Sequence, residues 1–173
     1  MANYAAVQLF IYDVSDTDRP AVLNAIWDAG LSSGRTLGTP TTVDLGAPYS
    51  NHDAPLGTST DLARALLEQA PSATFELWQD AFDEIGHYVG HVPRLGVLDT
   101  ECDGQGRPVL RLDHMVTTLS GLPDGTTVAS WLASADGPAH AISVLTRLRA
   151  LNAQATQHLQ IAPRTAAATG AAL

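Results

Sequence analysis

Hydrophobic and polar positions in the first third of the chain change from a strand-like to a helix-like pattern. Residues 5–14 form an almost continuous run of apolar and β-favouring side chains, which predicts a strand covered on both faces. N-cap candidates follow at 15–18, and Pro20 suits a first helical turn. Apolar residues then recur at helical spacing as far as Leu31, which predicts an amphipathic helix.

The middle of the chain reads as strands separated by loops and one more helix. A short strand is expected at 41–45 and an irregular loop at 46–58. A helix then begins with Thr58, Ser59 or Thr60 as its cap and runs to about Gln69. Further strands are predicted at residues 74–79, 85–92, 96–102 and 108–112.

The C-terminal third is predicted to be helical. A short helix opens at Thr126 or Thr127, and a longer one follows Asp136-Gly137-Pro138. We expect a single domain over 1–161 and an Ala/Thr-rich tail over 162–173. The element order predicts an α+β fold, with a mixed or mainly antiparallel sheet, helices packed largely on one face, and C-terminal helices. A ferredoxin-like arrangement is one candidate.

Charge narrows the range of partners. Nine basic residues, all of them arginine, stand against 18 acidic ones, so the formal net charge of the 173 residues is -9. Such a chain repels nucleic acid and anionic lipid, so neither is expected as a direct partner. Residues 1–104 carry 15 acidic and 4 basic side chains, and residues 105–173 carry 3 and 5. This asymmetry favours an acidic surface that meets a protein with a basic one.

No membrane or secretory segment is expected. The sequence contains no run of 18 apolar residues, and its first six residues lack the basic segment of a secretory signal. Its single cysteine, Cys102, has no partner for an intramolecular disulfide and is interpreted as a small buried hydrophobe. Together these features predict a cytoplasmic protein.

Several kinds of chemistry lack their motifs. The chain has no Gly-x-Ser-x-Gly, no lysine for a Schiff base, no phosphate-binding Gly-x-x-x-x-Gly-Lys and no Gly-x-Gly-x-x-Gly after the first strand. Asp99, Glu101, Asp103 and Gly104 resemble the start of an EF-hand loop, but the twelfth position is Leu110 instead of a glutamate. We therefore expect no cofactor and no calcium site.

Histidines supply weak candidates for a metal or acid–base site. His87 and His91 share one face of a predicted strand but lie about 13 Å apart, too far to bind one ion. Tyr49, Asn51, His52 and Asp53 gather in the predicted loop, and Asp113-His114 ends a predicted strand. No metal is expected, and the weak candidates are His52, Asp53, His87, His91 and His114.

Aromatic and acidic residues suggest a protein-binding surface. Trp27 and Trp131 lie among apolar neighbours and are expected in the core, whereas Trp78 falls on the opposite face of its strand from Phe75 and Leu77. The predicted surface comprises Trp78, Asp80, Phe82, Asp83 and Glu84, and a second acidic patch comprises Asp16, Asp18 and Asp28.

The sequence thus favours a non-enzymatic acidic protein that binds another protein, as an inhibitor, an immunity protein or a DNA mimic does. Two alternatives stay open. One is a structural subunit of a homo-oligomeric or viral assembly. The other is a small metal-dependent or acid–base hydrolase that uses the loop and strand histidines.

Overall fold

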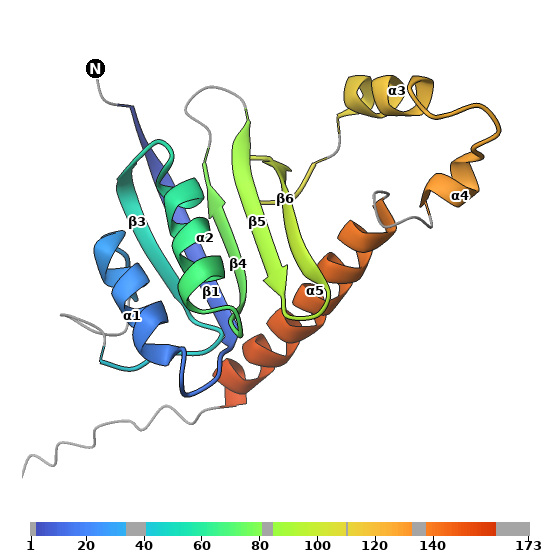
Figure 1. Cartoon of the computed structure of the whole chain (residues 1–173). Helices are drawn as coiled ribbons and strands as arrows, with labels where there is room; N and C mark the ends of the chain where they lie inside the picture. Colours follow the sequence, from blue (N-terminus) through green and yellow to red (C-terminus); the bar gives the residue numbers. More distant parts are fainter. Residues whose placement is uncertain (1–2, 34–40, 81–84, 110, 133–137, 162–173) are drawn as a thin grey trace, which may run out of the picture.

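The chain forms one six-stranded antiparallel sheet with helices on both sides (Figure 1). The computed structural model describes residues 3–33, 41–80, 85–109, 111–132 and 138–161. The strands lie in the order β2-β3-β1-β4-β5-β6, and every neighbouring pair is antiparallel. Their bounds are β1 Tyr4–Asp13, β2 Ser32–Ser33, β3 Pro48–Pro55, β4 Thr74–Gln79, β5 Gly86–Val92 and β6 Gly96–Cys102.

The first six elements follow the βαββαβ order of the ferredoxin-like arrangement. Helix α1 (Arg19–Asp28) connects β1 to β2, and helix α2 (Thr58–Gln69) connects β3 to β4. Strands β5 and β6 then extend the sheet beyond β4. The predicted α+β fold is confirmed.

One side of the sheet is packed against α1 and α2. Val7, Leu9 and Ile11 alternate along β1 and join a core that includes Ile26 of α1 and Leu66 of α2. All five side chains are almost completely buried. This core accounts for most of the buried apolar residues described, and burial of a side chain of this size contributes about 1.5–3 kcal/mol.

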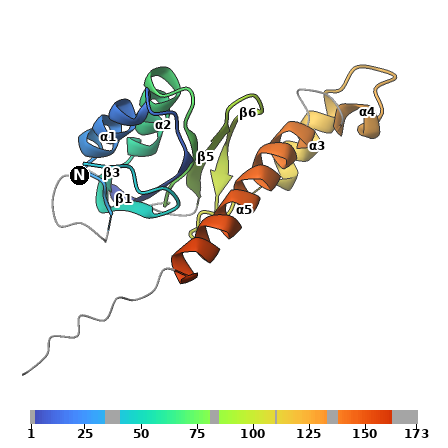
Figure 2. The ribbon, with the colours of Figure 1, turned by 90° about the horizontal axis from the view of Figure 1, so that it is seen from below.

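The opposite side of the sheet carries helix α5 (Pro138–Ile161), as Figure 2 shows. Val144 and Leu148 of α5 are fully buried against Tyr12 of β1 and Val92 of β5. Alternation along β1 therefore supplies both cores, because successive side chains of a strand point to opposite faces. The long C-terminal helix is thereby placed on the face that α1 and α2 leave open.

Two expectations for the segment between α1 and α2 are wrong. Residues 41–45 form no strand, and β3 lies where the turn-forming residues predict a loop. Its prolines stand at its two ends, and Asn51 lies at an irregularity in the pairing with β1. Pairing with the central strand thus overrides the local preference for a loop.

The segment after β6 also differs from expectation. The described residues of the predicted strand 108–112, which are 108, 109, 111 and 112, form no strand, although Pro108 makes an isolated bridge with Cys102. Helix α3 (Leu112–Ser120) begins there instead and, with α4 (Val128–Leu132), stands away from the sheet in Figure 1. The predicted positions of α4 and α5 are confirmed.

Trp27 is not in the core. Its residue surface is 59% exposed, because α1 buries Val22, Ala25 and Ile26 and this spacing leaves residue 27 on the outer side of the helix. Within the described residues, no helix is long and apolar enough to cross a membrane. The predicted tail, 162–173, lies outside the described residues.

The carboxylate of Glu76 lies between the sheet and α5. Glu76 of β4 accepts hydrogen bonds from the hydroxyl groups of Tyr12 and Tyr88, the latter at 2.7 Å. Burial, with the nearby negative charge of Glu76 as a further cause, raises the pKa of both tyrosines far above its ordinary value. Both hydroxyl groups therefore stay protonated in the folded protein at any ordinary pH.

Gly46 lies against α5, and its substitution tests how closely the two segments pack. Its φ is +73°, and a Cβ there would overlap the Cβ of Ala155. We expect Gly46→Ala to lower the free energy of unfolding by about 2–4 kcal/mol, from left-handed strain and overpacking together. Gly125→Ala, at φ +86° with open space around it, is the matched control and should cost about 1–2 kcal/mol. Equal losses in urea titrations would contradict the close packing of Ala155.

The tyrosine pair predicts a loss of stability at high pH. Tyrosines in the unfolded chain ionise near pH 10, whereas Tyr12 and Tyr88 keep their protons when folded. Their contribution is complete below pH 10, and each should lose about 1 kcal/mol between pH 10 and 11. Urea titrations should show a shallower decline for Tyr88→Phe, while Tyr4→Phe, an exposed control, keeps the wild-type slope. An unchanged slope for Tyr88→Phe would refute this linkage.

Candidate functional site

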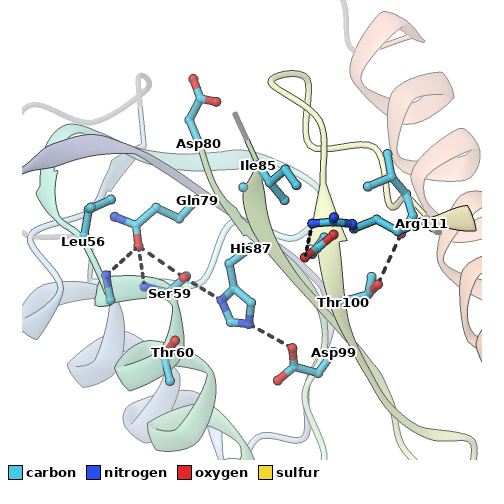
Figure 3. Close-up of a pocket in the computed structure, with 14 residues that line it drawn as sticks. Leu56, Ser59, Thr60, Gln79, Asp80, Ile85, His87, Asp99, Thr100 and Arg111 are labelled. Carbon is cyan, nitrogen blue, oxygen red and sulfur yellow. Dashed lines mark hydrogen bonds and ion pairs between the residues drawn. The ribbon is translucent and has the colours of Figure 1, made fainter. Parts of the chain in front are cut away.

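A pocket lies where α2 begins, beside β4, β5 and β6 (Figure 3). Its volume is about 630 Å³, within the range of small-molecule sites. Gln79, His87 and Asp99 line it from the side of the sheet that carries α2, and β5 and β6 extend the sheet beyond β4. The two strands added to the βαββαβ unit therefore form one wall of the pocket.

Ser59 lies at the start of α2. The helix begins after Gly57, whose φ of +92° turns the chain from the end of β3 into the first helical turn. Ser59 is the second helical residue and is only 1% exposed, yet it lines the pocket. The left-handed turn at Gly57 thus brings a hydroxyl group from the helix start toward the β5 strand.

His87 and Asp99 come from the neighbouring strands β5 and β6. Register places His87 opposite Glu101 and Val89 opposite Asp99, so His87 and Asp99 are diagonal neighbours on the same face. Diagonal side chains are within reach of one another when one of them is long. Strand pairing alone therefore brings the imidazole and the carboxylate together.

These three residues form an unbroken chain of hydrogen bonds. His87 Nε2 lies 2.9 Å from an oxygen of Asp99, and His87 Nδ1 lies 2.8 Å from Ser59 Oγ. An ionised carboxylate only accepts hydrogen bonds, so Nε2 carries the proton in this contact. In the neutral imidazole Nδ1 is then the acceptor for the Ser59 hydroxyl proton.

Gln79, at the end of β4, holds the start of α2 in place. Its Oε1 accepts hydrogen bonds from the backbone N–H groups of Gly57 and Ser59, both at 3.2 Å. Its Nε2 donates to the Pro55 carbonyl at 2.8 Å, which fixes the orientation of the amide. Ser59 Oγ also lies 3.2 Å from Oε1, so it has an acceptor there when His87 is protonated.

Charged side chains line the outer part of the pocket. Asp80, Asp99 and Glu101 contribute carboxylates, and Arg111 contributes one guanidinium group. Arg111 makes a 2.9 Å contact with Asp113 and approaches Glu101 at 4.0 Å. Apolar surface comes from Leu56, Ile85 and Val109. The pocket is therefore polar around Ser59 and His87, and its outer part combines charges of both signs with apolar side chains.

The strand histidines have different roles. His87 and His91 share a face of β5, as predicted, but His91 is buried, where its Nδ1 donates to the Ala73 carbonyl at 2.7 Å and its ring packs on Phe75. His87 lines the pocket with 31% of its side chain exposed. Across the described residues, no group of three or more His, Cys, Asp or Glu is arranged to hold a metal ion.

The other acid–base candidates do not converge on this pocket. His52 and Asp53 are exposed on β3, which β1, β4 and β5 separate from β6. At about 4.8 Å between strands, that distance is on the order of 20 Å. His114 belongs to α3, and its side chain lies outside the described part of the structure.

The predicted protein-binding surface is described only in part. Trp78 is half-buried, with its ring against Gly106, and Asp80 lies at the pocket rim. Phe82, Asp83 and Glu84 lie outside the described residues. The tryptophan is therefore covered by the turn after β6 instead of standing free.

The second acidic patch is divided by the length of a helix. Asp16 and Asp18 precede α1, whereas Asp28 ends it, about 15 Å away at 1.5 Å per residue. Asp18 accepts hydrogen bonds from the backbone and hydroxyl groups of Ser72, which lower its pKa. Asp16 pairs with Arg19.

Cys102 and the EF-hand-like segment have structural roles. The Cys102 thiol is buried, and burial with nearby Asp103 raises its pKa to about 11. Asp103 accepts hydrogen bonds from the N–H groups of Arg107 and Gln105 and closes the turn after β6. These bonds hold the pKa of Asp103 below its usual value.

Sequence reasoning missed Ser59 and Gln79 as site residues. Ser59 is interpretable from the sequence as a helix cap, and Gln79 as the last residue of a strand. Their relation depends on the register between distant strands, for which the sequence carries no local signal. No protein-family model, curated protein or solved structure matched the chain.

Proposed function

We propose that this pocket is the active site of a small hydrolase that cleaves a polar ester, with Ser59 as the nucleophile. The observation that carries the proposal is the continuous chain of hydrogen bonds from Asp99 through His87 to Ser59. A nucleophile hydrogen-bonded to a base, which a third group orients, is the arrangement that activates a hydroxyl group. This is the acid–base alternative of the sequence, with a serine added and no metal required.

Each residue of the chain has a chemical role. His87 Nδ1 accepts the hydroxyl proton of Ser59, and Asp99 fixes the tautomer and stabilises the imidazolium ion that results. In serine proteases the two ring nitrogens are used the other way round, with Nε2 facing the serine. These roles require only that each ring nitrogen lies within hydrogen-bond distance of its partner. Nδ1 lies 2.8 Å from Ser59 Oγ, and Nε2 lies 2.9 Å from Asp99 Oδ1.

The proposed reaction transfers the acyl group of the ester to Ser59 and then to water. Ser59 Oγ bonds the carbonyl carbon while its proton moves to His87, and the leaving alkoxide takes that proton as the C–O bond breaks. Water then gives a proton to His87 and attacks the acyl carbon. The carboxylic acid leaves, and the proton on His87 returns to Ser59.

The start of α2 supports negative charge near the carbonyl oxygen. Helix N-termini present backbone N–H groups without intrahelical acceptors, together with the positive end of the helix dipole. Gln79 already accepts from the Gly57 and Ser59 amides, which keeps Ser59 fixed against the base. Thr60, the third residue of α2, lines the pocket in the same turn.

A fluorophosphonate probe tests the nucleophile in the full-length protein. We expect one covalent adduct, located on Ser59 by mass spectrometry of the intact protein and its peptides. Ser59→Ala should abolish this adduct, and Ser143→Ala, at an exposed serine of α5, should keep it. An absent adduct, or one that persists in Ser59→Ala, would refute the proposal.

The orienting role of Asp99 is tested by the rate of labelling. Asp99→Asn should slow labelling by about 10²-fold, at the low end of acid–base contributions, because water reaches this exposed carboxylate. Asp61→Asn, at an exposed aspartate of α2 outside the pocket, is the matched control and should leave the rate unchanged. Circular dichroism spectra confirm that each variant is folded. Equal rates for Asp99→Asn and wild type would contradict this role.

A further inference from the structure

The two helical sides of the sheet carry opposite charge. We define the acidic helix face as α1, α2 and the turn before α1, whose charged residues are Asp16, Asp18, Arg19, Asp28, Asp61, Arg64 and Glu68. Five carboxylates against two arginines give this face a net charge of -3. The uneven charge of the sequence therefore appears in the fold as a difference between faces.

The outer surface of α5 is the basic helix face. Helix α5 contains Arg147 and Arg149 and no acidic residue, so its formal charge is +2 with neutral histidines. Both arginines are exposed, and so are Ile142 and Ala153. Because Val144 and Leu148 are buried against the sheet, Ile142 and Ala153 are directed away from it, and Arg147 and Arg149 flank this outer surface on its two sides.

An exposed aromatic residue stands on the acidic helix face. Trp27 lies on the outer side of α1 and precedes Asp28 in the sequence. Tryptophan is among the residues that most often anchor protein interfaces, and arginine side chains bind over its ring. Ala150 and Ala153, which are small and exposed, lie near these arginines in the sequence of α5.

We propose that the occupant of each face is a second copy of this chain, with the acidic helix face of one molecule against the basic helix face of the next. Charge complementarity selects the pairing, and Trp27 supplies apolar contact at its centre. This inference is independent of the hydrolase proposal. It also moves the predicted acidic binding surface from Trp78 to Trp27.

Geometry predicts the form of the assembly. The two faces lie on opposite sides of one sheet, as Figure 2 shows, so a molecule that binds through one face leaves its other face open. Head-to-tail interfaces of this kind generate rings or open chains instead of closed two-fold dimers. The assembly should therefore continue beyond two molecules as concentration rises.

Sedimentation velocity on the full chain provides the first test. At low salt the weight-average mass should rise with concentration above twice the monomer mass of 18.2 kDa. In about 1 M salt, where charges are screened within about 3 Å, it should fall toward the monomer. A monomer under all conditions, or a dimer that salt does not affect, would overturn the proposal.

Charge reversal tests the specific faces. Arg147→Glu with Arg149→Glu reverses the basic helix face, and Asp28→Arg with Glu68→Arg reverses the acidic one. Each pair alone should abolish association at low salt. The four changes together in one chain should restore it, because the two faces are again complementary. Failure of the four-fold variant to associate while folded would contradict the pairing.

Matched controls distinguish the effect of the two faces from the effect of the net charge of the molecule. Asp124→Arg and Arg107→Glu change exposed charges outside both faces and should leave the mass distribution as in wild type. Trp27→Ala should weaken association at low salt about tenfold or more, as expected for an anchor residue. Unchanged association in Trp27→Ala, or its loss in both controls, would show that the proposed faces do not form the contact.

Discussion

Alternation of side chains along the two central strands is the constraint on which the rest of this structure depends. β1 lies between β3 and β4, and its odd- and even-numbered residues supply two different cores. Leu9 and Ile11 pack under α1 and α2, whereas Tyr12 packs under α5. A shift of one residue in the register would exchange the two sets and leave both helical layers without their apolar partners. The positions of both helical layers therefore follow from one strand.

The same alternation determines where chemistry can take place. Gln79 and His87 lie on the face that carries α2, at the point where this helix begins and the sheet continues into β6. Glu76, three residues before Gln79 on β4 and on the other face of the sheet, is instead enclosed by tyrosines beneath α5. Gln79 is thus available to the pocket, whereas Glu76 supports the packing of α5. Gln79 and Glu76 have different surroundings because their side chains point to opposite faces of the sheet, and not because of their residue types.

Local patterns in the sequence predict the regular elements well and the site poorly. The strands at 74–79 and 96–102 and the helix at 58–69 have the expected bounds, because apolar spacing and caps are local signals. β3 was hidden by Pro48 and Asn51, whose turn preference is overridden by pairing with β1. Helix α3 was missed although Leu112, Met115 and Leu119 have helical spacing. The contact of Ser59 with His87 joins residues 28 positions apart and requires the strand order, which no local pattern supplies.

The tautomer of His87 tests the central claim most directly. In a long-range ¹H–¹⁵N spectrum of the imidazoles at a pH of about 8, His87 should carry its proton on Nε2. His91, which donates to the Ala73 carbonyl, should carry its proton on Nδ1 and serves as an internal reference. Ser59→Ala should shift the Nδ1 resonance of His87 and leave that of His91 in place. A proton on Nδ1 of neutral His87 would contradict the relay from Ser59 to Asp99.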